Sequence, residues 1–410
     1  MQLEFPSVGV GHARHADAVT AARNAARQAR QQLHGSLRSS WLLTFAGGRH
    51  DPAEVLKGLH AELGDLPVVG GCGAGVISGA MAGTSGYECG VMLFPDTLPP
   101  VAIVSADGLD HDEAAAGRRL GADLRALGLP QGSAVMLFYD SVRSASPPAL
   151  HVASRLLDGL YQGLADCHPQ VIGAGTLTDL GLSASYVFDG QQVRQHTAVA
   201  VVLPHALTGH VAVMHGCLPA SDFLEITRIE GARVLEIDGR PALEVVVERL
   251  GVSRAELIAR QPLPSLTLGE KHGDPYAPFK ESHYVNRLVM AVDPVDDALV
   301  LFEADFNVGS RVQLMAYEPR RMIESAREQT RELLAGLPPG APAFGLYIDC
   351  AGRSMAFSGM EEDEAAPVRQ QVDALCPLLG FYSGVEIAPF LGRARPLDWT
   401  GVLVVFTHSA

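Results

Sequence analysis

The chain has 410 residues, of which 47% are hydrophobic and 19% are charged, and its formal net charge is −15 at pH 7. This composition is too apolar for a disordered chain, and the length allows two or more hydrophobic cores. A nucleic-acid-binding surface is not expected, because a polyanion requires clustered Lys and Arg and no such run occurs.

Hydrophobic periodicity predicts the same order of elements three times along the chain. The first copy has helices at 13–33 and 52–63 and strands at 41–46, 66–71 and 86–94. The second has strands at 101–107, 133–140, 170–175 and 196–203 and helices at 111–127 and 148–165. The third has strands at 311–318, 343–350, 377–384 and 400–406 and helices at 319–335 and 362–375. Residues from about 209 to 305 do not share the pattern.

Each copy also contains a glycine break near the end of a predicted strand. The three stretches are VGGCGAGVIS (69–78), VIGAGTLT (171–178) and LLGFYSGVEI (378–387), in which Gly71, Gly173 and Gly380 occupy corresponding places. The first does not have the G-x-G-x-x-G spacing of a dinucleotide site. Because glycine lets the backbone approach a ligand closely, we expect the three turns to border a shared cleft.

The order of elements predicts the fold class. Strands alternating with helices favour sheets covered by helices, and the paired strands that close each copy favour mixed pairing. We therefore expect an α/β fold, with α+β as the alternative, built from repeated β-α-β-α-β-β units.

Location and redox state follow from absences in the sequence. No stretch reaches the roughly 18 apolar residues of a membrane span, and the N-terminal residues MQLEFPSVGVGHARH lack the layout of a secretory signal. We expect a cytoplasmic protein that binds no membrane. The six cysteines include no C-x-x-C pair, so mostly buried, reduced thiols are expected and no metal site.

Several motifs resemble the FIST family. Residues 215–221, 226–246, 306–325, 348–354 and 380–389 resemble the FIST C domain, and VVGGCGAGVISG with VIGAGTLTD resembles the FIST N domain. The resemblance implies two FIST-type lobes, a FIST N-like domain at 1–205 (units 1–96 and 97–205) and a FIST C-like domain at 206–410. The family's Tyr-Ser-x-Gly-Glu is replaced here by Tyr382-Ser383-Gly384-Val385-Glu386.

The same resemblance carries the functional expectation. It implies a stand-alone bacterial sensory protein that binds a small ligand, an amino acid among the candidates, and reports to a separate signalling protein. One alternative is a haem-based nitric oxide sensor that regulates a histidine kinase, and another is an interaction scaffold without a ligand. No G-x-S-x-G, H-E-x-x-H or Walker motif occurs, so we do not expect an enzyme.

Candidate ligand-binding residues lie mainly in the last third of the chain. Arg353, close to Cys350 at the end of a predicted strand, offers a guanidinium for a carboxylate, or alternatively forms a structural ion pair, for example with Glu386. Tyr382, Ser383 and Glu386 offer two hydroxyls and an acid, which suit an amine or an amino acid. For Tyr382 and Glu386 the alternatives are packing and pairing.

The other candidates are the small groups of the first two glycine breaks and one histidine. Cys72, Gly73 and Thr176 are expected to line the same cleft. If haem is the cofactor, His215 is the candidate iron ligand because it ends the apolar strand HVAVMH. The alternative is a histidine on the surface or hydrogen-bonded in the core.

Overall fold

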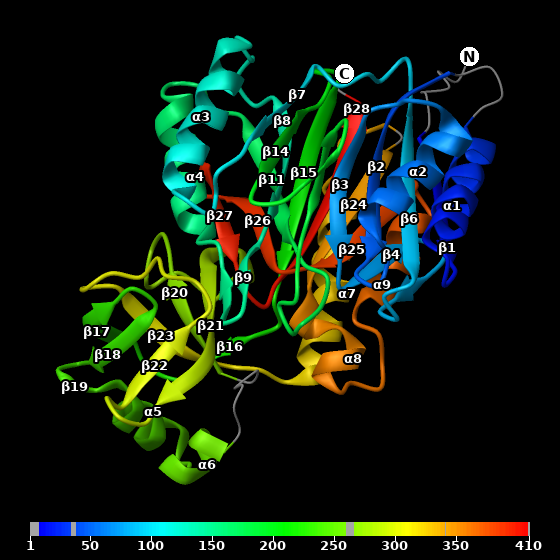
Figure 1. Ribbon diagram of the computed structural model, residues 1–410. Helices are drawn as coiled ribbons and strands as arrows, with labels where there is room; N and C mark the ends of the chain where they lie inside the picture. The colour runs from blue at the N-terminus through cyan, green and yellow to red at the C-terminus, as the bar shows by residue number, and fades with distance from the viewer. Residues whose placement is uncertain (1–7, 34–37, 260–265, 341, 409–410) are drawn as a thin grey trace. The chain divides into compact units, whose positions relative to one another are not determined.

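The computed structural model describes residues 8–33, 38–259, 266–340 and 342–408, and these form two compact units. The three-repeat unit comprises the described residues up to 212, residues 327–396 and those from 401 onward (Figure 1). The barrel unit comprises residues 213–326 and 397–400. In chain order, most of the barrel unit is therefore an insertion within the third repeat.

The first two repeats are continuous in the chain. The first consists of β1 (Gly9–Arg14), α1 (Ala18–Gln32), β2 (Ser39–Gly47), α2 (Pro52–Leu63), β3 (Val68–Gly73), β4 (Gly75–Ser78), β5 (Ala82–Gly83) and β6 (Glu88–Pro95). The second consists of β7 (Ala102–Ala106), α3 (Glu113–Ala126), β8 (Ala134–Asp140), β9 (Val142–Ala145), β10 (Pro148–Leu150), α4 (Ala153–Leu164), β11 (Gln170–Thr176), β12 (Val187–Gly190), β13 (Val193–Arg194) and β14 (Ala198–Val202).

The third repeat is interrupted by the barrel unit. It consists of β15 (Leu207–Met214), α7 (Pro319–Ala335), β24 (Pro342–Cys350), the 3-10 turn η2 (Ala351–Arg353), α8 (Met355–Ser358), α9 (Ala365–Asp373), β25 (Leu378–Ser383), β26 (Val385–Phe390), β27 (Arg393–Leu397) and β28 (Gly401–His408). The predicted strand at 311–318 is present, but its predicted place as the first strand of this repeat is wrong. That segment forms β23 (Arg311–Ala316) of the barrel unit, and β15 takes the position beside β28. The interruption hid this relation, because the true first strand precedes its helix by about a hundred residues.

The three repeats build three six-stranded mixed sheets. Each sheet contains four strands of one repeat and two strands of another. The strand orders are β1-β6-β2-β3-β12-β13, β27-β26-β11-β8-β14-β7 and β15-β28-β24-β25-β4-β5. In every sheet the middle pair, β2 with β3, β8 with β11 or β24 with β25, is parallel. Strands β4 and β5 of the first repeat complete the third sheet, β12 and β13 complete the first, and β26 and β27 complete the second. Each repeat therefore gives two strands to the sheet of another repeat, and the three exchanges connect the sheets in a closed ring.

Three glycines occupy equivalent places in this ring. They are Gly70, Gly173 and Gly380, which lie opposite Thr44, Leu137 and Tyr347 on the neighbouring parallel strands. A Cβ at any of the three would overlap the carbonyl oxygen of that opposite residue, so only glycine fits. The expected equivalence of Gly71 with the other two is thus wrong by one residue.

Aromatic side chains fill the centre where the three sheets meet. Strands β3, β11 and β25 each contact the other two. The Phe45 ring stacks on Phe381 at 3.9 Å between centroids and meets Phe138 at 5.5 Å. Each of these rings is fully buried. The middle of the ring is therefore packed apolar core.

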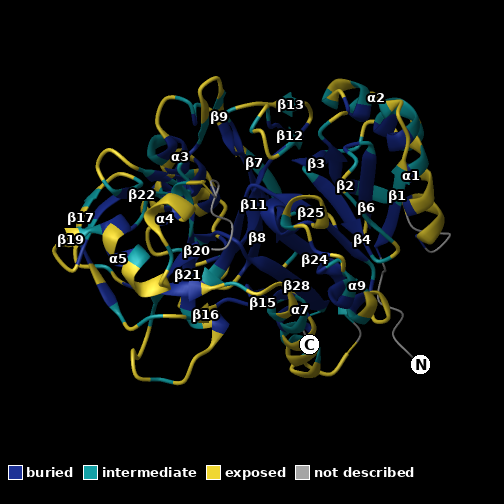
Figure 2. Cartoon of the chain, turned by 90° about the horizontal axis from the view of Figure 1, so that it is seen from below, coloured by how far each residue is buried: buried dark blue, intermediate teal, exposed yellow. Residues whose placement is uncertain are grey.

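Helices cover the outer faces of the sheets. Helices α1 and α2 pack together over the first sheet and α3 and α4 pack together over the second, while α9 contacts β25 of the third. Figure 2 shows the strands as mostly buried and the outer sides of α1 and α4 as exposed. The expected α/β class, with mixed sheets covered by helices, is confirmed.

The barrel unit has a different architecture. It contains β16 (Leu218–Pro219), β17 (Leu224–Glu230), β18 (Arg233–Ile237), β19 (Arg240–Pro241), α5 (Ala242–Leu250), α6 (Arg254–Ala259), β20 (Leu266–Lys271), η1 (Glu281–His283), β21 (Tyr284–Asp293), β22 (Ala298–Leu301) and β23 (Arg311–Ala316). The strand order β23-β17-β18-β22-β21-β20 closes because β20 also pairs with β23. Apolar residues of these strands and of α5 form its own core. Among the described strands, closure leaves no long open edge in this barrel.

Candidate functional site

The small residues of the first two glycine breaks lie in the packed core. The Cys72 side chain is fully buried, its thiol lies 3.7 Å from the backbone oxygen of Tyr186, and burial raises the pKa of this thiol to about 12. Thr176 is also fully buried and donates a hydrogen bond to a backbone oxygen of β8. A Cβ on Gly73 would lie 3.2 Å from the Cβ of Phe381. A neutral thiol in such surroundings is a packing group rather than a nucleophile.

Arg353 lies at the end of the 3-10 turn that follows β24, and its side chain is completely buried. Its Nε donates to Asp349 at 3.0 Å and to Glu364 at 3.1 Å, and its terminal nitrogen forms a further ion pair with Glu364. Tyr347 donates its hydroxyl to the same glutamate at 3.1 Å. Burial raises the pKa of Asp349 well above its usual range, with Glu364 adding to the rise and Arg353 opposing it. Two acids, one guanidinium and one phenol hydroxyl therefore form a buried, hydrogen-bonded cluster.

The other candidates from the third break adjoin this cluster. Tyr382 donates its hydroxyl to Asp363 at 3.3 Å, and burial raises its pKa. Ser383 donates to Glu386 at 2.7 Å, and both of these side chains are fully buried. Cys350 pairs with Ser383 in the register of β24 and β25.

The predicted ligand-binding residues of the third break thus lie in one region: Arg353, Tyr382, Ser383, Glu386 and Cys350. Polar groups of Arg353, Tyr382, Ser383 and Glu386 form hydrogen bonds with other groups of the protein. The ion-pair partners of Arg353 are Asp349 and Glu364, which the sequence interpretation did not name. A buried guanidinium whose charge is already balanced has little to offer an incoming carboxylate. A ligand-binding role for these residues stays a prediction, and the geometry favours a structural one.

His215 in the barrel unit does not fit an axial haem ligand. The ring is buried, and its Nδ1 accepts a hydrogen bond from the backbone N–H of Cys217 at 3.0 Å. Its Nε2 lies 3.3 Å from the backbone oxygen of Glu281, so Nε2 carries the proton. Iron ligation needs a nitrogen lone pair that is directed to the metal, and neither ring nitrogen has one to spare. Among the residues described, no group of three or more His, Cys, Asp or Glu side chains is placed to hold a metal ion.

A pocket of about 410 Å³ in the three-repeat unit borders β1, α1 and the connection between α9 and β25. The Ser78 hydroxyl and His12 Nδ1 lie 3.2 Å apart in its lining. Gln28 and Gln32 of α1 use their side-chain oxygens to accept from backbone N–H groups of β1, an edge strand. These polar groups therefore serve mainly to satisfy the exposed edge of the sheet.

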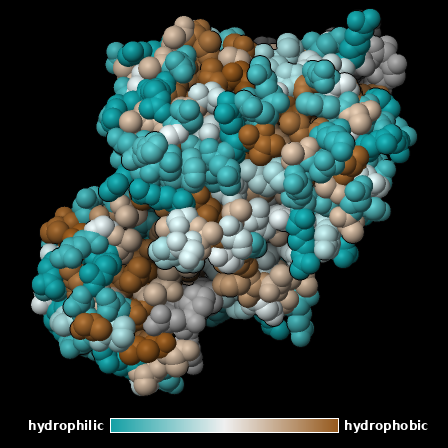
Figure 3. Space-filling view, viewed as in Figure 1, coloured by the Kyte–Doolittle hydropathy of each residue, from teal (hydrophilic) through white to brown (hydrophobic). Residues whose placement is uncertain are grey.

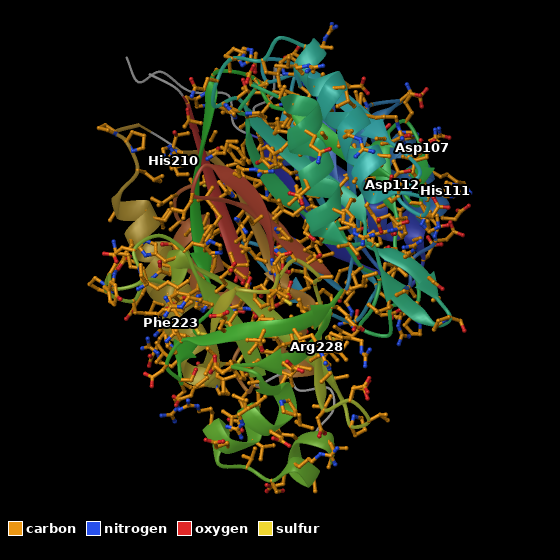
Figure 4. All side chains as sticks on the ribbon, turned by 90° about the vertical axis from the view of Figure 1, so that its left-hand side faces the viewer. Asp107, His111, Asp112, His210, Phe223 and Arg228 are labelled. Carbon is orange, nitrogen blue, oxygen red and sulfur yellow. The ribbon has the colours of Figure 1, made fainter. Side chains whose placement is uncertain are left out.

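A larger pocket, of about 740 Å³, lies in the second repeat of the three-repeat unit. The connection from β7 into α3 and the connection from β13 into β14 line it. Asp107, His111 and Asp112 lie near one another at the start of α3 (Figure 4). The charged and titratable side chains in the lining are Asp107, Asp110, His111, Asp112, Arg119, Arg194 and His196.

One residue of this pocket, His196, connects it to a buried chain of titratable groups. Its Nδ1 lies 3.0 Å from Nε2 of His151, whose own Nδ1 lies 3.5 Å from Glu113. Arg143 approaches the same glutamate at 3.8 Å. Glu113 and His151 are almost fully buried, whereas the His196 side chain is 36% exposed. Burial lowers the pKa of His151 to about 4, so this ring is neutral near pH 7.

A second contact ties His196 to the end of β8. Its backbone N–H donates to the buried carboxylate of Asp140, which also accepts from the Ser185 hydroxyl. Burial raises the pKa of Asp140, and these two hydrogen bonds oppose the rise. His196 itself has a positive φ of 48°, a sparsely populated conformation for a side chain of this size. Pocket-lining and buried groups therefore meet at one constrained residue.

The sequence interpretation did not find this site. Its members come from several separate segments between Asp107 and Thr197, so no short motif contains them. The available signal was Asp140, a carboxylate that ends the apolar stretch SAVMLFYD. The carboxyl ends of parallel strands are where α/β proteins commonly bind ligands.

Comparison with known proteins places the chain in a family. Family models match it as a FIST N domain at residues 40–240 and a FIST C domain at residues 242–389. An uncharacterized protein of Mycobacterium bovis, Mb0898c, is 26% identical over 415 residues, covering 98% of this chain and 99% of the relative. An uncharacterized protein of Mycobacterium tuberculosis, MT0656, is 24% identical over 417 residues, with coverages of 97% and 99%.

A crystal structure of a chorismatase aligns over 99% of this chain and 100% of its own, at 9% identity and a TM-score of 0.33. No helix among the described residues is long and apolar enough to cross a membrane. FIST domains are associated with signal transduction and small-ligand sensing. Because the two domain models follow one another along the chain and together match most of its residues, the chain belongs to the FIST family.

Proposed function

We propose that this protein is a non-enzymatic sensor that binds a small ligand and reports to a separate signalling protein, such as a histidine kinase. The association of FIST domains with sensing supports this proposal. The single observation that carries it is the pocket of the second repeat, in which His196 joins a space of about 740 Å³ to a buried charged network. Pockets of this size accept small molecules.

The lining suits a ligand with charges of both signs. Asp110 and Asp112 are acidic, while Arg119 and Arg194 are basic, and all four border the same pocket. An amino acid presents an ammonium group and a carboxylate that can each meet an opposite charge there. Arg119 also contacts Asp107, so a ligand carboxylate would compete for an exposed ion pair rather than a buried one.

Signalling requires that the ligand bind two states of the protein with different affinity. The pocket wall contains the start of α3 and the residues that lead into β14, so closing on a ligand would shift elements that continue into the second sheet. On the face drawn in Figure 3, hydrophobic residues occur in small groups among hydrophilic ones. A partner that docks on this face would therefore meet a mainly polar surface.

A thermal-shift screen with the twenty amino acids, followed by isothermal titration calorimetry, tests the proposal. A ligand should raise the melting temperature of the wild type, and Arg119→Gln should weaken its binding by about tenfold or more, the loss expected for one charged hydrogen bond. Arg125→Gln, on the same helix but outside the pocket lining, is the matched control and should bind normally. Equal affinity in both variants would show that the ligand binds elsewhere.

The alternatives make different predictions in the same experiment. An interaction scaffold without a ligand gives no shift with any compound. A haem-based nitric oxide sensor gives a Soret band after haem addition, and its axial ligand would have to be a residue other than His215 unless the barrel unit rearranges around that ring.

A further inference from the structure

The chain of groups from Glu113 to the pocket indicates where the protons of two histidines lie. The Glu113 carboxylate accepts hydrogen bonds only, and its oxygen lies 3.5 Å from Nδ1 of His151, so it favours a proton on that nitrogen. His151 Nε2 then has a lone pair, and at 3.0 Å it accepts from Nδ1–H of His196. The remaining ring nitrogen of His196, Nε2, therefore also has a lone pair.

The contacts of the ring engage Nδ1 with buried groups and leave Nε2 for the pocket. The Nδ1 edge of His196 faces inward, with Asp140 at 3.8 Å and His151 at 3.0 Å. His196 lines the pocket and its side chain is 36% exposed, so Nε2, to which the Nδ1 contacts leave the lone pair, is the ring nitrogen with which a ligand could bond. With this tautomer the pocket contains a preset hydrogen-bond acceptor.

The charges around His196 come from every element that packs near it. They are Asp140 on β8, His151 before α4, Glu113 at the start of α3, Arg143 on β9, Asp107, Asp110, His111 and Asp112 before α3, Arg119 on α3 and Arg194 on β13.

Most of the positive charge in this set is already engaged. Arg119 contacts Asp107, Arg194 donates to Asp189 at 2.9 Å, and Arg143 approaches Glu113. Asp110, in contrast, has a histidine, His111, at 3.6 Å as its ion-pairing neighbour. The surroundings of His196 are therefore net acidic and favour a cationic group of the ligand.

We propose that His196 is the proton-controlled acceptor of the pocket: its Nε2 accepts a hydrogen bond from a cationic N–H group of the ligand, and protonation of this ring abolishes that binding. Protonation replaces the lone pair with a second N–H and adds a positive charge that repels the ligand cation. The inference rests on the proposed function, because it takes this pocket as the ligand site. It adds a residue, a ligand group and a pH dependence to that proposal.

The first test needs no ligand. Long-range proton–nitrogen NMR on the full chain with ¹⁵N-labelled histidine, assigned with His151→Gln and His196→Gln, reports the tautomer of each ring. At pH 8 both rings should be protonated on Nδ1 and not on Nε2. A proton on Nε2 of His196 at that pH would overturn the proposal.

The second test uses 1,4-diaminobutane, whose two ammonium groups stay charged between pH 5.5 and pH 8. Calorimetry should show binding at pH 8 that weakens by about tenfold or more at pH 5.5, since each pH unit below the midpoint of a linked protonation can cost a factor of about ten. In His196→Gln the amide oxygen accepts the same hydrogen bond but does not titrate, so binding at pH 8 should persist and the pH dependence should disappear. His60→Gln, a histidine variant on α2 outside the pocket, should keep the wild-type pH dependence.

The outcomes separate this inference from the proposed function. If an amino acid binds the pocket with an affinity that depends on Arg119 but not on pH or on His196, the proposed function stands and the acceptor role is wrong. If 1,4-diaminobutane fails to bind at pH 8 at millimolar concentration, the assigned ligand group is wrong. If no compound binds in either experiment, both proposals fail.

Discussion

Replacing Arg353 by methionine should destabilise the protein severely. The substitution keeps most of the side-chain volume but removes the positive charge from a cluster in which Asp349 is fully buried and Glu364 is 2% exposed. Breaking a buried ion pair by removing one partner typically costs about 3–5 kcal/mol, because the remaining charge is left without compensation. We expect Arg353→Met to lie in that range.

The penalty should also depend on pH in a defined direction. Burial already raises the pKa of Asp349, and removing the guanidinium that opposes this rise should raise it further. When the folded-state pKa of an acid lies above its unfolded value, the protein loses stability as the pH rises from the unfolded pKa toward the folded pKa. The difference between Arg353→Met and the wild type should therefore be larger at pH 8 than at pH 5.

Urea denaturation followed by circular dichroism at the two pH values measures both effects. Arg118→Met is the matched control, because Arg118 is about half exposed and its ion pair with Asp112 spans 3.9 Å. Exposed pairs contribute about 0–1 kcal/mol. A loss below about 1 kcal/mol for Arg353→Met, without a pH dependence, would refute the assignment of a structural role, and loss of ligand binding in a stable Arg353→Met protein would restore the predicted ligand clamp.

Three further predictions concern other parts of the chain. Burial lowers the pKa of His151 to about 4, below its unfolded value, so the wild type should lose stability as the pH falls from about 6.5 toward 4. The loss should be at most about 1.4 kcal/mol per pH unit, and it should be smaller in His151→Gln. An equal loss in both proteins would assign the acid sensitivity to other groups. Gly380→Ala should cost about 1–3 kcal/mol in urea denaturation because its Cβ would overlap the carbonyl oxygen of Tyr347, whereas Gly336→Ala, whose nearest neighbour lies at 3.4 Å, should be nearly neutral. If the purified protein shows a Soret band with haem, His215→Ala should leave that band in place, and its loss would mean that the barrel unit rearranges on binding haem.

Local patterns in the sequence were sufficient for much of the fold. Apolar runs and helical periodicity identified most strands and helices of the three repeats, because each element is buried on a regular face. The first strand, β1, was missed since GVGHAR contains two glycines and a charged end. The place of β15 was missed for a different reason: its partner β28 lies almost two hundred residues away in the chain, and pairing over that distance leaves no local signal.

The site was harder to predict than the fold. The sequence motifs pointed to the region of Arg353 and Ser383, but whether such groups face a ligand or one another depends on tertiary contacts with Glu364 and Glu386. His196 resembles any histidine that precedes a strand. Only the folded chain shows that its ring meets His151 and borders a pocket.

The exchanged strands of the three repeats have a consequence for how the chain can be divided. Each sheet receives its last two strands from another repeat, so the arrangement has the connectivity of a domain-swapped trimer whose subunits are joined end to end. A fragment that ends near residue 205 would keep β11 without β26, and would leave β4 without β25. Three repeats that complete one another in this way should unfold together, and neither half should be stable alone.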